Sequence, residues 1–332
     1  MRYGRWTDLV IGREGMTLVE LLVVVTIVLL LAAATIPRFQ PGIDRSRIRE
    51  AARSLQLYLS SARNQAIATG RSCGVMIERL PAEAGCSMLV SQVESPPPYC
   101  GDGTPTLANV TVVSAPPGGT ATVSVTAGWT AIKAGDLVQF DYQGPYYTVA
   151  TASASAMTAT LDLSQGQAIP WTTALSTPVP FKVFRQPVKS AASALQFPSP
   201  AVIDLTLSGP DPVPATGTAT FWYTASGDTT PLTIIFAADG SIDRVYVENV
   251  ITHPVTPIYL LVGKRENVND PNPQNSNLQA SDAYNNLWLA INPRTGLIVT
   301  TELAATGAAT GAQAVIYQSR AFARQSDAMG GK

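Results

Sequence analysis

The residues that usually carry catalysis or hold metals are scarce in this chain. It has one histidine, His253, and three cysteines, Cys73, Cys86 and Cys100, among 332 residues. No G-x-S-x-G, P-loop or dinucleotide-binding glycine motif lies between a predicted strand and a predicted helix. His253 lies in the loop THPVTP, with no acid or cysteine at metal-ligand spacing. We therefore expect no enzyme activity, no metal and no cofactor.

The cysteines and one polar loop suggest structural chemistry at most. Cys86 and Cys100 flank a proline-rich stretch and could form a disulfide in an oxidising compartment, worth about 3 kcal/mol in the chain-entropy model. Cys73 is expected to be a buried free thiol, but it could compete for either partner. The loop Asn267–Asn277 is rich in oxygen ligands, yet its only acid is Asp270, so we expect no Ca²⁺ site there.

One acid stands out because of its surroundings. Residues 16–36 are apolar except for three threonines and Glu20, and as a helix they would span about 31 Å, close to the thickness of a bilayer core. Three arginines precede this run, which predicts a cytoplasmic N-terminus. A charge within a membrane helix costs about 2.5–3.5 kcal/mol. Glu20 is therefore a functional candidate, with a plain signal anchor carrying a stray acid as the alternative.

The residues around Glu20 follow a specific order. Gly15 precedes Met16, and Glu20 lies near the start of the apolar run. This order resembles the processing site of type IV prepilins, in which a short basic leader ends in glycine and an acid follows five residues into the mature chain. Met16 stands where Phe is usual, and Glu14 where a basic residue is usual. The resemblance implies that a prepilin peptidase cuts between Gly15 and Met16 and methylates the new amino group of Met16.

The same resemblance implies a role for Glu20. In an assembled filament, its carboxylate would lie beside the α-amino group of Met16 of a neighbouring subunit. Opposite charges attract strongly in a low-dielectric environment, and a paired charge is tolerated where a lone one is not. Glu20 would therefore favour assembly and set the register between subunits.

Residues 16–71 are predicted to form one long N-terminal helix, kinked at Pro37. Beyond the kink, one apolar stripe repeats at helical spacing, which indicates packing against a sheet. The stripe consists of Ile48, Ala52, Leu55, Leu59, Ala62 and Ala66. Gly70 is expected to end the helix.

The end of this helix carries a second motif. The stretch SARNQAIATGRSCGVMIE, residues 60–78, resembles that of GspH/FimT-type minor pilins and pseudopilins, in which an ARxxAI-like helix end leads through a polar turn into the first strand. The matching residues are Ala62, Arg63, Ala66, Ile67, Gly70 and Arg71. Two later stretches, TIIFAADGSI and LWLAINPRTGLIV, resemble the C-terminal sheet of the same group.

Strands are indicated by alternation and β-branched content in the rest of the chain. In the predicted body they are 72–78, 202–207, 218–224, 232–237, 242–247, 258–262, 287–291 and 297–301. In a stretch that does not fit the resemblance they are 121–125, 137–142, 146–150 and 158–163, which we interpret as an inserted β module forming a small barrel or sandwich. Its aromatic residues Trp129, Tyr142, Tyr146, Tyr147 and Trp171 are expected to form its core rather than a ligand-binding face.

The predicted fold class is α+β: a pilin-like fold with a long transmembrane N-terminal helix packed on an antiparallel sheet, plus an inserted all-β module. The predicted divisions are the leader 1–15, the helix 16–71 with its membrane part 16–36, a β domain of 72–100 and 185–302, the inserted module 101–184, and a C-terminal tail 303–332.

The predicted function is that of a non-enzymatic minor pilin or pseudopilin. It would sit in the inner membrane by a single pass, with its body in the periplasm, and join a type II secretion pseudopilus or a type IV pilus as a low-copy subunit near the tip. Its expected partners are other pilin or pseudopilin subunits, the prepilin peptidase and the inner-membrane assembly platform. The net charge of −1 gives no case for a nucleic-acid partner. The alternative is a membrane-anchored protein whose β module recognises a carbohydrate or another surface partner without forming filaments.

Overall fold

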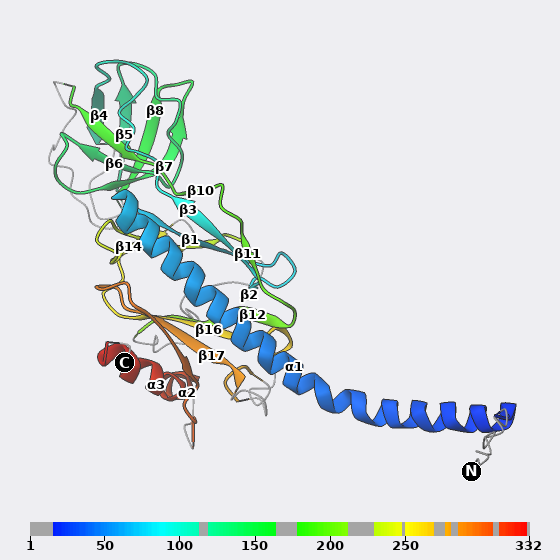
Figure 1. Cartoon of the computed structure of the whole chain (residues 1–332). Coiled ribbons are helices and arrows are strands. Elements are labelled where there is room, and N and C mark those ends of the chain that lie inside the picture. Colours follow the sequence, from blue (N-terminus) through cyan, green and yellow to red (C-terminus); the bar gives the residue numbers. More distant parts are fainter. Residues whose placement is uncertain are drawn as a thin grey trace, which may run out of the picture. The chain divides into compact units, whose positions relative to one another are not determined.

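The computed structural model describes residues 16–112, 119–163, 178–211, 229–247, 250–268, 276–279, 285–307 and 312–330, excluding the side chains of 33–41, 112, 250 and 312. The chain divides between Ser46 and Arg47 into two compact units. Helix α1, Leu18–Thr69, contributes to both. The rest of the second unit is mostly β-structure (Figure 1).

Among the described residues, the strands of the second unit form three antiparallel sheets. The first contains β10 (Val188–Lys189), β3 (Leu89–Glu94), β1 (Cys73–Glu78), β13 (Leu232–Phe236), β14 (Ile242–Val247) and β15 (Val250–Thr252) in this order, with β11 (Leu195–Gln196) also paired to β3. The second contains β18 (Ile298–Glu302), β17 (Leu287–Ile291), β16 (Ile258–Lys264), β12 (Ala201–Pro210) and β2 (Cys86–Ser87). The third contains β4 (Ala108–Val112), β5 (Gly119–Val125), β8 (Thr158–Leu163), β7 (Tyr147–Ser153), β6 (Leu137–Phe140) and β9 (Phe181–Phe184).

This architecture corrects the predicted fold class. The described residues are largely β-structure in three sheets, rather than one sheet covered by a pilin-like, transmembrane helix. Helix α1 is long but not apolar along its length, because polar and charged residues dominate the exposed face of the part that belongs to the second unit. The other helices, η1 (Arg265–Asn267), α2 (Ala312–Ser319) and α3 (Ala321–Ala328), are short.

The predicted membrane span is also corrected. Within the described residues, no helix combines the length and the apolar character needed to cross a bilayer. The apolar part of α1 that is described with its side chains extends over residues 18–32, about 22 Å of helix against a bilayer core of about 30 Å. The predicted transmembrane helix over 16–36 and the single-pass inner-membrane location are therefore wrong by this finding.

The predicted apolar stripe of α1 is confirmed. Ile48, Ala52, Leu55, Leu59, Ala62 and Ala66 are all fully buried. They share one hydrophobic core with inward-facing residues of both the first and the second sheet, such as Ile234 and Leu260. In Figure 1, the part of α1 that belongs to the second unit lies along these sheets. Each large aliphatic side chain buried in this way contributes about 1.5–3 kcal/mol. The C-terminal end of α1 follows the prediction, since Gly70 adopts a left-handed backbone with φ of +64°.

Arg63 connects α1 to both sheets through two β turns. Its Nε donates to the carbonyl of Gly240, 3.1 Å away, and its Nη2 donates to the carbonyl of Thr295, at 2.9 Å. Gly240 belongs to the turn between β13 and β14, and Gly296, beside Thr295, to the turn between β17 and β18. A Cβ on Gly296 would lie 1.8 Å from the Gly240 carbonyl oxygen. The arginine of the ARxxAI-like motif therefore has a structural role here.

The strands of the region predicted as an inserted module, 101–184, form a closed barrel. Besides the sheet order given above, Ala108 in β4 exchanges backbone hydrogen bonds of 2.8 and 2.9 Å with Val179, just before β9. This pairing joins the two ends of the sheet. The barrel has its own core, in which the ring of Trp129 packs edge-to-face on Phe181 with centroids 5.8 Å apart. Of the two architectures left open by the sequence, the structure has the barrel.

The predicted strands agree closely with the observed ones in most of the body, and β8, β14 and β17 have the predicted bounds. The predicted strand 218–224 lies outside the described residues. Seven observed strands were not predicted, mostly short ones: β2, β3, β4, β9, β10, β11 and β15. The predicted tail 303–332 contains α2 and α3, which pack on the second sheet.

Arg320 holds these C-terminal helices in place. It is fully buried where α2 meets α3, and its guanidinium carbon lies 4.6 Å from the centre of the Tyr259 ring and 4.9 Å from that of Trp288. Its Nη1 donates to Asp211 at 2.9 Å, and its Nη2 to the carbonyl of Leu207 at 2.9 Å. Burial lowers the pKa of Arg320 to about 10, so the side chain remains charged at neutral pH.

We expect Arg63→Ala to destabilise the second unit by about 1–3 kcal/mol, because two turn carbonyls lose bonds to a charged donor. Arg63→Lys should recover only part of this loss, since an ammonium cannot donate from a fork. Denaturant midpoints measure the effect. Arg53→Ala, which changes an exposed arginine of the same helix, is the control. Equal midpoints for Arg63→Ala and Arg53→Ala would contradict the structural role of Arg63.

Candidate functional site

The N-terminal part of α1 is a continuous exposed apolar surface. From Leu18 to Leu31 its large aliphatic side chains have exposed fractions between 47% and 79%, on all sides of the helix. Met16, just before the helix, is 60% exposed. Apolar surface of this extent in a single chain marks an interaction site.

Glu20 lies in the first turn of this helix. The backbone N–H of Glu20 donates to Thr17 Oγ1 at 3.3 Å, so Thr17 caps the helix. Thr17 and Glu20 have the spacing of a capping box, and an acid in the first turn interacts favourably with the helix dipole. The carboxylate of Glu20 thus lies where the helix dipole favours an acid, in addition to the intersubunit pairing implied by the resemblance.

The predicted cleavage site and the predicted helix kink are not tested by the described residues. Gly15 lies outside the described residues, so the cleavage between Gly15 and Met16 stays a prediction. Pro37 lies within α1, which continues through it as a helix, and its side chain is outside the description. The predicted kink at Pro37 therefore stays a prediction too.

The three cysteines are free thiols, so the structure does not contain the candidate Cys86–Cys100 disulfide. Cys86 is fully buried in β2, where its thiol donates to the Glu83 carbonyl and to Glu83 Oε2, both at 3.5 Å. Burial raises the pKa of Cys86 to about 12. Cys100 is exposed. Cys73 is buried as predicted, and burial raises the pKa of its thiol. The buried thiols of Cys73 and Cys86 are therefore protonated at neutral pH, and a protonated thiol is a weak nucleophile.

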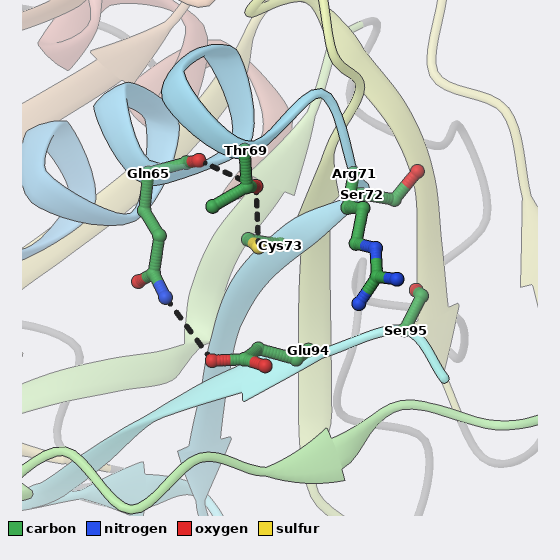
Figure 2. Close-up of a pocket in the computed structure, with 7 residues that line it drawn as sticks. All are labelled: Gln65, Thr69, Arg71, Ser72, Cys73, Glu94 and Ser95. Carbon is green, nitrogen blue, oxygen red and sulfur yellow. Dashed lines mark hydrogen bonds between the residues drawn. The ribbon is translucent and has the colours of Figure 1, made fainter. Parts of the chain in front are cut away.

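One cavity lies where α1 meets the first sheet (Figure 2). It has a volume of about 450 Å³, and its lining residues are Gln65, Thr69, Arg71, Ser72, Cys73, Glu94 and Ser95. Glu94 Oε1 accepts hydrogen bonds of 3.1 Å from Gln65 Nε2 and from Ser190 Oγ. Figure 2 shows the Cys73 sulfur next to Thr69, at the end of the helix. The cavity is polar, but it pairs no activated nucleophile with a base.

A buried polar network around Asp204 was not predicted. Asp204 is fully buried in β12, at a bulge opposite β16. Its Oδ2 accepts from Asn277 Nδ2 at 2.9 Å, and its Oδ1 accepts from the backbone N–H of Thr206 at 3.0 Å. Asn277 also accepts from the backbone N–H of Lys264 at 2.9 Å. The network thus joins the bulge to the end of the polar loop 267–277, whose residues 269–275 lie outside the described part.

Metal-ligating groups do not converge in the described residues, where no cluster of three histidines, cysteines or acids is placed to hold an ion. His253 is exposed, and its Nδ1 lies 2.8 Å from the carbonyl oxygen of Asp243. That contact gives the histidine a local structural role.

The aromatic residues of the barrel divide into two groups. Trp129 and Tyr147 are buried in its core, as predicted. Tyr142 and Tyr146 are exposed, which contradicts the prediction that they belong to the core. Trp171 lies outside the described residues. The two exposed tyrosines lie between β6 and β7, where the chain turns. The prediction assigned Tyr146 and Tyr147 to the core together, although alternation places adjacent strand residues on opposite faces.

No family model, curated protein or solved structure matches this chain. The candidate sites therefore rest on the sequence and the geometry described above.

The pH dependence of stability should reveal Asp204. Burial, the largest influence, raises the pKa of Asp204 above that of an exposed aspartate. In the folded state Asp204 therefore keeps its proton to a higher pH than in the unfolded state. Its contribution to stability is fully present below about pH 4 and is lost as pH rises through the folded pKa, at about 1.4 kcal/mol per pH unit in that window.

Urea midpoints across this pH range, compared between the unmodified protein and Asp204→Asn, isolate this contribution. Asp239→Asn is a control of opposite sign, because hydrogen bonds from Ser241 lower the pKa of exposed Asp239. A difference between the unmodified protein and Asp204→Asn that does not change with pH would contradict the predicted titration.

Proposed function

We propose that this chain is a non-enzymatic filament subunit that assembles through its N-terminal helix after cleavage between Gly15 and Met16. This is the role of a minor pilin or pseudopilin. The observation that carries the proposal is the exposed apolar surface of α1 from Leu18 to Leu31. Other subunits presenting the same helix would cover it, and the burial would supply the driving force for assembly.

The sequence order around Met16 supports the same role. Cleavage after Gly15 would place a charged amino group next to the first turn of α1. A helix start favours acids and disfavours a further positive charge, because its free N–H groups carry partial positive charge. Glu20 of another subunit can neutralise that amino group. The helix start and the intersubunit pair therefore both favour a negative charge at Glu20, but only the pair needs a second subunit.

The body supports a low-copy position near the filament tip. The second unit carries a six-stranded barrel with its own core in addition to the two body sheets. Subunits that repeat along a shaft at short axial spacing leave little room for such an addition. A type II secretion pseudopilus and a type IV pilus both offer a tip position, and we propose the shared role rather than one of the two machines.

Cleavage and the charge of Glu20 can be tested together in cells that contain a prepilin peptidase. We expect the mature chain to start at N-methylated Met16 by mass spectrometry of its N-terminus. Glu20→Gln should be processed normally, because it leaves Gly15, Met16 and the apolar run unchanged. The variant should nevertheless enter filaments at most about one tenth as often as the unmodified chain, because the charge pair is lost. A tenfold loss corresponds to about 1.4 kcal/mol.

Glu50→Gln is the matched control, since it removes an exposed acid of the same helix and should leave incorporation unchanged. An intact leader in the presence of active peptidase would overturn the proposed function. Normal incorporation of Glu20→Gln would show that assembly does not need the charge of Glu20.

Copy number tests the proposed position. Quantitative mass spectrometry of purified filaments should find this chain at a small fraction of the major subunit. A ratio near one would contradict the tip position and indicate that the barrel is accommodated along the shaft.

A further inference from the structure

The segment between β6 and β7 holds two aromatic rings in solvent on a constrained backbone. Asp141 and Tyr142 both adopt positive φ, at 52° and 57°. The backbone N–H of Gln143 donates to the carbonyl of Phe140 at 3.3 Å, which closes the turn around them. A tyrosine with positive φ is uncommon and costs conformational energy. A glycine would adopt this backbone more readily. The ring of Tyr142 therefore stands at this position at a cost in conformational energy.

The outer face of β9 supports both rings. The ammonium of Lys182 lies 4.7 Å from the centre of the Tyr142 ring, and Phe184 packs edge-to-face on Tyr146 with centroids 5.2 Å apart. Lys182 and Phe184 alternate with the core residues Phe181 and Val183 along β9, so they point to the same side, about 6.7 Å apart along the strand. The two rings remain 51% and 43% exposed. They therefore form a two-ring platform that is held in position before any partner arrives.

Hydrogen-bonding groups surround the platform. Asp141 Oδ2 accepts from Gln143 Nε2 at 3.5 Å, so a carboxylate and an amide flank Tyr142 in contact with each other. Gln139 Nε2 donates to the carbonyl of Gly144 at 3.1 Å, between the two tyrosines in the chain. A carboxylate accepts only, whereas an amide both donates and accepts. This combination suits a partner that carries many hydroxyl groups.

We propose that this platform binds a neutral oligosaccharide. The platform consists of the rings of Tyr142 and Tyr146, which pack on Lys182 and Phe184 of β9. Sugar rings present C–H faces, which pack on aromatic rings. They also present hydroxyl groups, which need both hydrogen-bond donors and acceptors. The barrel disfavours a peptide added as a strand, because β6 is already paired on both sides, with β7 and β9. The platform also disfavours nucleic acid, which needs several cations to neutralise its phosphates. Lys182 is the cation that supports the platform, and the exposed carboxylate of Asp141 lies beside it. The proposal concerns the barrel alone and does not depend on filament assembly.

Calorimetric titration of the purified full chain tests the proposal. The probes are cellohexaose, maltohexaose and the hexamer of N-acetylglucosamine, at concentrations up to millimolar. We expect at least one of them to bind, and Tyr142→Ala and Tyr146→Ala each to weaken that binding about tenfold. Tyr142→Phe should retain it, because the ring stays. Tyr142→Gly should lose it while keeping or raising the thermal midpoint, because glycine relieves the positive φ.

Tyr317→Ala is the matched control. Tyr317 is 56% exposed and also lies under a cation, Arg324, but it belongs to α2. Its removal should not change sugar binding. The proposal is overturned if none of the three sugars binds, if Tyr317→Ala weakens binding as much as Tyr142→Ala, or if only a proline-rich peptide titrated in parallel binds at the two tyrosines.

Discussion

Burial of one face of α1 is the contact on which the body of this protein depends. The stripe from Ile48 to Ala66 is fully buried and belongs to the same core as the inner faces of two sheets. Neither sheet could bury its apolar face alone, and their strands interleave in sequence, since β12 follows β11 and β13 follows β12. The helix is thus the element that makes the two sheets one folding unit. Arg63 reinforces this arrangement at the turns, where its guanidinium bonds one carbonyl from each sheet.

Buried polar groups fix the positions of elements that apolar packing alone would not hold in one arrangement. Arg320 fastens the C-terminal helices to the far side of the second sheet through Asp211 and two aromatic rings. Asp204 organises a bulge that apolar side chains could not hold, because the irregular backbone leaves N–H groups in need of partners. Buried groups of this kind cost desolvation energy unless they are satisfied, so they favour a single arrangement over near alternatives.

The contrast between the two parts of α1 connects structure to the proposed role. In one part the apolar side chains are covered by sheets, and in the other they are exposed. The exposed part is the surface that the proposed assembly would bury. The barrel, in turn, is complete without the rest of the body because it has a separate core. Assembly through the helix and recognition through the barrel can therefore be carried by one chain without competing for the same surface.

The sequence by itself determined the features that depend on near neighbours. The 3–4 spacing of the stripe, the helix end at Gly70 and the strands at β8, β14 and β17 follow from local periodicity and backbone preference, which act within a few residues. Only the tertiary structure decided which polar groups are buried together, because their partners are distant in sequence. Arg320 and Asp211 are 109 residues apart, and Asn277 and Asp204 are 73 apart. The same holds for the tyrosines of the barrel: alternation places the adjacent Tyr146 and Tyr147 on opposite faces, and only the closure of the sheet determines which of the two rings enters the core.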